Sequence, residues 1–456
     1  MATIDVTGTT TARPAAATAP HGPSDLSPRR WNPFTRILFR FCFLYFGLYC
    51  LAAPVMLYEF TGLFRSWLPD DALIWLIRLL EPALSWVGHT IFDVDVVVIL
   101  NGSGDQSIYW ILQFCLLIVA LVGTLAWTTL DTRRTEYRRL AGWLLLGLRL
   151  CVAAQMVHYG LAKVIPVQMP EPDLTTLLTP VGDLTPFTLL WNQVGVSPEY
   201  QTLLGTAELV AGLLLFIPRT ALLGTILAVV SMAQVFILNM TFGVPVKLFS
   251  GHLLLIGLVL LAPEARRLTA VLVWNRSTEP STTPYPFHTP RVRRIAAGAQ
   301  AALALWVTVS MTYLTWDIWQ MVGPDRPKPA LYGIWTVTEF LRDGHSVPPL
   351  LTADDIRWRT VIFDHVGQIS YQLTDGTLIT APGTVDATTH RIAIAGAPSG
   401  DTPSATLTFE QSATDRTTLT GNLGPHPVAI TLQRVDPDTF PLRSTTFRWI
   451  QDRPAR

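Results

Sequence analysis

The chain has 456 residues, of which 50% are hydrophobic and only 14% are charged, against roughly 25% charged in an ordinary soluble protein. Basic and acidic residues each number 33, so the formal net charge is zero. This balance excludes a nucleic-acid binder that works through a basic surface, and the composition excludes a disordered or collagen-like chain.

The charge deficit is confined to the first part of the chain. Residues 1–320 carry 40 charged side chains, or one in eight, whereas residues 321–456 carry 26, close to one in five. The first two-thirds therefore predicts a membrane body, and the last third predicts a soluble domain.

Residues 1–32 predict a disordered cytoplasmic tail, because they are rich in Ala, Thr and Pro and have no apolar periodicity. From 33 to 140 we expect two transmembrane helices joined by a long outer loop. The first apolar run, 34–57, is long enough to cross a hydrocarbon core of ~30 Å and lacks the end of a cleavable signal peptide. The loop segment 69–100 mixes acidic residues with tryptophans and predicts an amphipathic helix on the membrane surface.

Six further apolar runs bring the number of predicted transmembrane helices to about seven. They are 109–130, 141–164, 199–217, 220–239, 248–263 and 295–315. Arginines concentrate in the loops on the side of the N-terminus, whereas the loops on the opposite side are acidic. The positive-inside rule thus places the N-terminus in the cytoplasm and the C-terminal domain outside a bacterial cell membrane.

Residues 321–456 predict a soluble antiparallel β-barrel after a Pro-rich linker. Turn signals such as Asp375-Gly376 and Pro382-Gly383 separate short alternating segments. The predicted strands are 331–341, 357–363, 367–373, 390–395, 405–409, 417–421, 427–432 and 444–450. Gly333-Ile334-Trp335 resembles the G-x-W of the first lipocalin strand, and a generic small barrel with a buried tryptophan fits the pattern equally well.

Ionisable residues inside apolar runs are the candidate functional residues, because each costs roughly 2.5–3.5 kcal/mol at the centre of a membrane helix. Glu208 lies about 15 Å into a helix that Ser197-Pro198-Glu199 is suited to begin. A buried carboxylate pairs with a cation or takes up a proton. Glu208 therefore either makes a structural interhelical hydrogen bond or serves as a functional proton or ligand site, and we take it as a candidate catalytic residue.

The run 141–164 supplies partners for this carboxylate. Gln155, His158, Tyr159 and Lys163 share one face of the predicted helix. His158 and Lys163 join the mid-membrane glutamate as candidate catalytic residues, and Gln155 and Tyr159 are candidate ligand-binding residues. The alternative for His158 is hydrogen-bonded packing.

Four more candidate ligand-binding residues come from the next two runs and their connector: Gln234, Asn239, Lys247 and His252. Lys163 and Lys247 are two of only three lysines, and a buried lysine, unlike arginine, can lose its proton. The alternative is that these two lysines lie near the predicted site by chance. We expect the candidate residues to line one cavity open to the outer leaflet.

Motifs for other chemistries are missing from the sequence. There is no H-x3-H metal spacing, no Gly-rich phosphate loop and no serine elbow, so we expect neither a metal site nor a self-contained catalytic motif.

The four cysteines lie in apolar runs without a CxxC pair, which indicates that they fill space as small apolar side chains: Cys42, Cys50, Cys115 and Cys151.

Several motifs resemble the DoxX family of bacterial four-helix membrane proteins. They are His158-Tyr159-Gly160-Leu161-Ala162-Lys163, Gly205-x-x-Glu208-x-x-x-Gly212, Arg219-Thr220, Asn239, and Val244-Pro245-Val246-Lys247 through His252. The resemblance implies a four-helix membrane core over 141–268, followed by a cytoplasmic loop and a further helix over 269–320. The whole chain is similar to a longer DoxX subgroup with a C-terminal β-rich domain.

The resemblance also implies a function. Some DoxX proteins are named as a small subunit of thiosulfate:quinone oxidoreductase, and others are linked to membrane complexes for oxidant defence. It implies quinone as a cofactor, the lipid bilayer as environment and a soluble or membrane oxidoreductase as partner. The three extra helices, the long outer loop and the barrel depart from the short family pattern.

The sequence therefore predicts an accessory, quinone- or lipid-linked subunit of a membrane redox complex. Glu208 would handle a proton, while His158 and Lys163 would hydrogen-bond a headgroup carbonyl. One alternative is a non-catalytic binder or carrier of small molecules or lipids, in which the β-domain feeds the membrane cleft. The other is a scaffold for a partner oxidoreductase.

Overall fold

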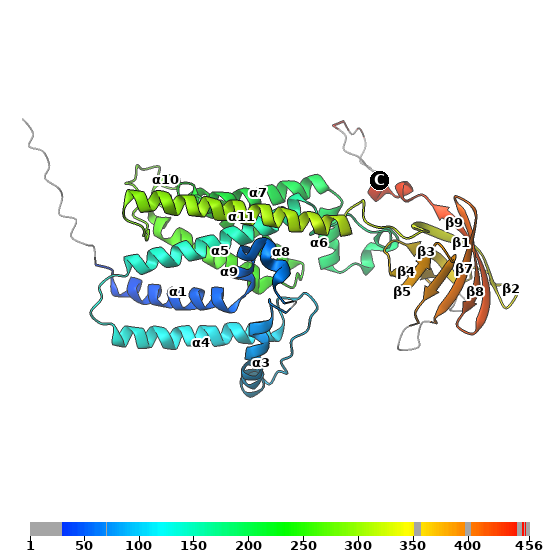
Figure 1. Cartoon of the computed structure of the whole chain (residues 1–456), viewed down its shortest axis with the longest axis horizontal. Coiled ribbons are helices and arrows are strands. Elements are labelled where there is room, and N and C mark those ends of the chain that lie inside the picture. Colours follow the sequence, from blue (N-terminus) through cyan, green and yellow to red (C-terminus); the bar gives the residue numbers. More distant parts are fainter. Residues whose placement is uncertain are drawn as a thin grey trace, which may run out of the picture.

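The computed structural model describes residues 30–69, 71–350, 357–396, 403–444, 449–450 and 452. It consists of a bundle of long helices and a C-terminal β-barrel beyond one end of that bundle (Figure 1). The predicted tail 1–32 lies almost wholly outside the described residues. The combination of a helical membrane part with a barrel domain is confirmed.

Six helical segments are long and apolar enough to cross a membrane. They are α1 (Pro33–Ala52), α4 (Ser107–Leu130), α5 (Arg138–Val164), α8 (Ala221–Thr241), the segment Lys247–Leu272, which includes α9 (Lys247–Leu261) and α10 (Ala265–Leu272), and α11 (Pro290–Val322). The remaining predicted run, 199–217, forms α7 (Pro198–Phe216), which is not one of these six. That α7 also crosses the membrane stays a prediction.

Shorter helices connect these long ones. They are α2 (Val55–Tyr58), η1 (Glu59–Trp67), α3 (Trp75–Val87), η2 (Gly88–Phe92) and α6 (Pro186–Gly195), with short turns η3 (Thr176–Leu178), η4 (Val181–Asp183) and η5 (Ala262–Glu264). Pro54 ends the first long helix because its ring cannot continue the α1 hydrogen-bonding pattern. Within the predicted surface segment 69–100, α3 buries Ile77 and Leu84 and exposes Trp75 and Trp86.

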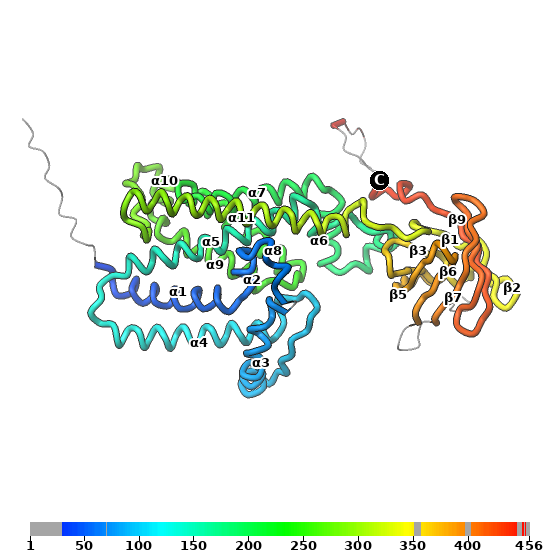
Figure 2. The backbone as a smooth tube through the Cα atoms, in the orientation of Figure 1, coloured from blue at the N-terminus to red at the C-terminus, as the bar shows by residue number. Residues whose placement is uncertain are grey.

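Helix α5 is the centre of the bundle. Two-thirds of its most apolar stretch is buried, against one-third or less in the other five apolar segments. It packs against α1, α7, α9 and α11. The tube in Figure 2 shows α5 running between α1 and α11. Side chains on several faces of α5 therefore point into protein, which makes it the helix best placed to hold a buried polar site.

The C-terminal domain is a closed antiparallel barrel, because β1 pairs with both β3 and β9. Its strands are β1 (Gly333–Arg342), β3 (Trp358–Phe363), β4 (Gln368–Leu373), β5 (Leu378–Asp386), β6 (Arg391–Ile394), β7 (Ala405–Ala413), β8 (Arg416–Leu423) and β9 (His426–Val435); β2 (His345–Ser346) pairs with the end of β1, and short helices η6 (Pro437–Thr439) and α12 (Pro441–Ser444) follow. Trp335, Trp358, Phe340 and Phe363 fill the interior.

One turn prediction is wrong, and one strand prediction falls largely outside the described residues. Pro382-Gly383 is not a turn: it lies inside β5, which the sequence pattern missed. Gly383 is required there because a Cβ would approach Ile369 and the Ala393 carbonyl to within 3 Å. The predicted strand 444–450 lies largely outside the described residues, and Ser444 itself closes α12.

The barrel docks on the bundle through the loop that follows α5. Leu174 of this loop is buried against Ile334 and Ile362 of the barrel. Asp364 at the end of β3 accepts a hydrogen bond from the Leu174 backbone N–H at 2.7 Å and pairs with Arg326 of the linker. These buried contacts fix the barrel beside the bundle end at which α5 terminates.

Candidate functional site

A buried ion pair joins α5 to α7. Lys163 Nζ donates to Glu208 Oε2 at 2.6 Å, and both side chains are about 5% exposed. The pairing follows from the close approach of the two helices, which share the largest helix–helix contact in the bundle. Glu208 is therefore compensated by a cation inside the bundle, one of the two states expected for a buried carboxylate.

Glycines allow α5 and α7 to approach closely. A Cβ at Gly205 would lie 2.6 Å from the Gly160 carbonyl oxygen and from Lys163 Cβ. Gly160 and Gly212 face equally close backbone contacts across the same interface. Small residues are the usual means by which membrane helices approach one another.

Replacing Gly205 by Ala should therefore push α7 away from α5 and separate Lys163 from Glu208. We expect the free energy of unfolding to fall by about 1–3 kcal/mol, the typical cost of overpacking. Thermal unfolding of the full chain in lipid nanodiscs measures this loss. Gly147, whose Cβ would meet no atom within 4 Å, is the matched control, and equal stability of Gly205→Ala and Gly147→Ala would contradict the prediction.

A second buried carboxylate lies beside the first pair. Glu59 is 2% exposed, and its Oε2 lies 3.3 Å from His158 Nδ1 without the alignment of a hydrogen bond. Gly62, with φ of 55°, turns η1 back against α11, where a Cβ would meet the Trp306 ring and Ser310 Oγ. The sequence analysis missed Glu59, because a carboxylate just past an apolar run resembles an ordinary loop residue. The one sign in the sequence that the chain turns back here was Gly62, three residues later.

Several buried polar atoms of η1, α5 and α7 have no hydrogen-bond partner among the described residues. Gln155 is fully buried; its Nε2 donates to the Val55 carbonyl at 2.7 Å, while its Oε1 is unpaired. Gln201, also fully buried, has no partner for either amide atom. Glu59 Oε2 and His158 Nδ1, which lie 3.3 Å apart, likewise make no hydrogen bond. Each such group costs roughly 1–3 kcal/mol unless water or a ligand satisfies it.

Tyr159 forms an aromatic wall beside these groups. Its ring meets that of His158 edge-on at 5.0 Å, and Lys163 Nζ lies 5.8 Å from its centroid. Phe249 of α9 lies on another side at 6.2 Å. We call Glu59, Gln155, His158, Tyr159, Lys163, Gln201 and Glu208 the polar cluster.

His252 belongs to a neighbouring group on α1 and α9. Its Nε2 lies 2.8 Å from the Tyr45 hydroxyl, and its Nδ1 lies 2.7 Å from the Leu248 carbonyl oxygen. The carbonyl can only accept, so Nδ1 carries the proton and Nε2 accepts from Tyr45. Tyr49 stacks on the ring at 4.1 Å. Because both ring nitrogens of His252 have partners, a structural packing role is favoured for this residue.

The other predicted residues have structural partners or face outward. Asn239 donates to Ser250 Oγ at 2.9 Å, which ties α8 to α9. Lys247 pairs with Asp105, which also accepts from the backbone N–H groups of Lys247 and Leu248 and so caps α9. Gln234 is exposed on α8. The structure gives Asn239, Lys247 and His252 partners other than the Lys163–Glu208 pair. That these residues line one cavity with Glu208, His158, Lys163 and Gln234 stays a prediction.

Two surface cavities lie elsewhere on the molecule. One, of about 40 Å³, is lined by the loop after α5 and the end of α11. The other is an apolar groove of about 350 Å³ between α1 and α4, at the bundle end opposite the barrel. No residue of the polar cluster lines either.

The fold and the site together define a helical membrane protein with a buried, charge-compensated polar cluster and an appended β-barrel domain. The chain belongs to the same family as the uncharacterized protein YwoB of Bacillus subtilis (strain 168). The two are 32% identical over 126 residues, which are 27% of this chain and 78% of YwoB. No family model matches the chain. No solved structure matches it either.

Proposed function

We propose that this chain is a DoxX-like, quinone- or lipid-linked subunit of a membrane redox complex, with the polar cluster as its headgroup site. The observation that carries the proposal is the set of unpaired buried atoms on Glu59, Gln155, His158 and Gln201. They belong to η1, α5 and α7, and α5 and α7 hold the buried Lys163–Glu208 ion pair. A headgroup with both acceptors and hydroxyl donors would satisfy them.

The donor and acceptor types of the cluster fit a quinone. Lys163, His158 and the Gln201 amide can donate to carbonyl oxygens, and the carboxylates of Glu59 and Glu208 can accept from hydroxyl groups. A bound quinone supplies two-electron chemistry in which two oxygens also gain or lose protons. Within the chain, Glu208 would hold or release a proton while Lys163 keeps its charge compensated, and Tyr159 would shield one side of the headgroup.

The proposal includes an orientation. The arginine-rich ends of α1 and α5 would lie in the cytoplasm, and the barrel would lie on the extracytoplasmic side of a bacterial cell membrane. The polar cluster would then sit in the outer half of the bilayer, close to the docked barrel. A partner oxidoreductase would supply or accept the electrons.

Lipid analysis of the gently extracted full-length protein tests the proposal. We expect a quinone to co-purify with the wild type and to be depleted at least tenfold in Glu208→Gln and in His158→Ala. Gln234→Ala, on the exposed face of α8, is the matched control and should retain it. Quinone absent from the wild type, together with unchanged membrane redox rates in Glu208→Gln, would refute the proposal.

The carrier alternative has less support. The barrel interior is filled by its own large side chains, including Trp335 and Trp358. If the barrel nevertheless delivers a lipid, deleting residues 324–456 should abolish lipid retention. Under our proposal this deletion leaves headgroup retention in the bundle.

A further inference from the structure

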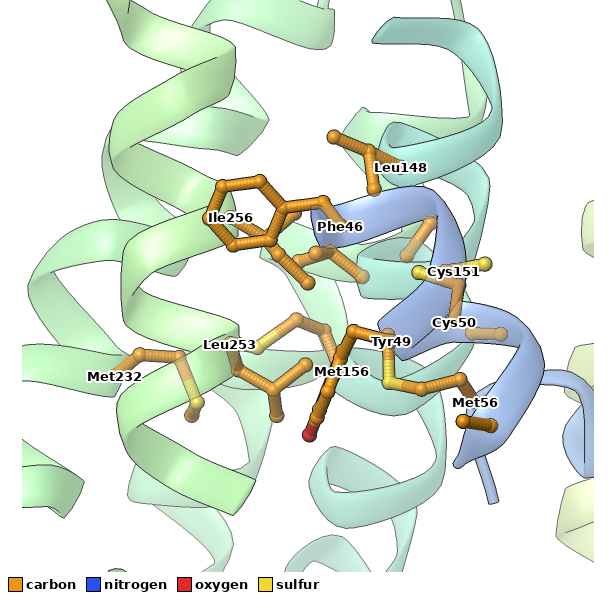
Figure 3. Close-up of a cluster of buried hydrophobic side chains, with 14 of the residues drawn as sticks. Phe46, Tyr49, Cys50, Met56, Leu148, Cys151, Met156, Met232, Leu253 and Ile256 are labelled. Carbon is orange, nitrogen blue, oxygen red and sulfur yellow. The ribbon is translucent and has the colours of Figure 1, made fainter. Parts of the chain in front are cut away.

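Two of the four cysteines meet inside the bundle. Cys50 of α1 and Cys151 of α5 lie side by side in the packed core of the bundle (Figure 3). They are 8% and 5% exposed, and both are free thiols. Cys42 and Cys115 are only partly buried. The spacing in sequence gave no sign of this contact, because it depends on how α1 packs against α5.

Cys151 lies next to one member of the polar cluster on α5. Cys151 and Gln155 are one helical turn apart on α5, a rise of about 6 Å. Gln155 donates to the carbonyl of Val55, which follows Cys50 closely in the chain. Tyr49, the neighbour of Cys50, stacks on His252. The thiols therefore lie close to Gln155 of the polar cluster and to the neighbouring group of His252.

We propose that Cys50 and Cys151 are a two-electron redox site that forms a disulfide between α1 and α5 when a quinone in the polar cluster is reduced. Two S–H bonds break and one S–S bond forms. The two electrons and two protons that the thiols lose convert the quinone to the quinol, so the step needs no other reactant. The inference rests on the proposed function only for the identity of the oxidant.

The proposed function requires a group in the membrane part that can carry electrons, and the thiol pair would be such a group. Among the described residues the single candidate metal-ligand cluster, at Asp173, Asp364 and His365, lies at the barrel junction, where Arg326 pairs with Asp364. A thiol pair would give the membrane part a redox centre of its own. The resulting disulfide would also tie α1 to α5 beside the cluster.

Disulfide mapping on the full-length chain tests the inference. The protein in phospholipid nanodiscs is reduced, desalted and incubated without oxygen with a short-chain benzoquinone or naphthoquinone. It is then denatured, alkylated and digested for mass spectrometry, while quinol is followed by absorbance. We expect a Cys50–Cys151 linked peptide, with quinol formed in equal amount. Cys50→Ser and Cys151→Ser should abolish both signals, and the control Cys42→Ala/Cys115→Ala should retain them.

Quinone retention, measured on the same samples, separates failure of the inference from failure of the proposed function. If quinone is retained but both thiols can still be alkylated, the redox role of the thiols is refuted and the proposed headgroup site remains supported. If the linked peptide and quinol form but no quinone is retained, the inference that Cys50 and Cys151 are a redox pair is supported. The proposal that the polar cluster is a headgroup site is then refuted. If neither signal appears with either quinone, Cys50 and Cys151 are packing residues and the inference is overturned.

Discussion

Replacing Lys163 by Met is expected to lower the free energy of unfolding by about 3–5 kcal/mol, the largest single effect in the membrane part. The cause is not the loss of an attractive contact alone. With Lys163 gone, Glu208 remains buried at 3% exposure with no cation beside it, and the bundle cannot solvate its charge. Denaturant or thermal unfolding of the full chain in lipid measures the loss.

The double variant Lys163→Met/Glu208→Leu should recover most of that loss, because it removes the uncompensated charge as well. Lys247→Met is the matched control: its pair with Asp105 is partly exposed, at 28% for the lysine side chain, so we expect a loss of only about 1 kcal/mol. Equal losses for Lys163→Met and Lys247→Met, or no recovery in the double variant, would contradict the buried-pair account.

Replacing Asp364 by Ala is expected to undock the barrel from the bundle. The carboxylate is 4% exposed and serves both the Leu174 backbone N–H and the Arg326 guanidinium. Its removal leaves a buried N–H and a largely buried cation unpaired, at a cost of about 3 kcal/mol. Limited proteolysis should then cut the linker 324–329 much faster, while the barrel itself stays folded.

Asp386→Ala is the control for this effect, because Asp386 accepts only from Thr388 and Thr389 in its own exposed turn. Its linker should be cut at the wild-type rate. Unchanged proteolysis of Asp364→Ala would show that the apolar contacts of Leu174 suffice for docking.

Sequence reasoning found the residues whose signal is local. Lys163 and Glu208 stand out as charges in apolar runs, and helical periodicity places Gln155, His158 and Lys163 on one face. The structure brings Lys163 onto Glu208 because glycines on both helices remove the intervening side chains. The strands of the barrel were likewise predictable from alternation, apart from β5 and the two-residue β2.

The missed features depend on tertiary contacts. Glu59 enters the bundle only because Gly62 turns the chain back. Gln201 is polar in the first turn of α7, where solvent exposure is the ordinary expectation, yet it is fully buried. The contact between Cys50 and Cys151 arises from the packing of α1 on α5. The residue pattern along one helix does not tell which residues of another helix its side chains will contact.

Photo-crosslinking with a quinone that carries a photoreactive group on its ring tests the central claim most directly. The claim is that the polar cluster inside the bundle, and not the barrel, holds the headgroup. Peptide mapping of the labelled full-length protein should place the adduct on α5 between Gln155 and Lys163 or on η1, and excess unlabelled quinone should compete it away. Adducts confined to the barrel, or to the groove between α1 and α4, would contradict the account.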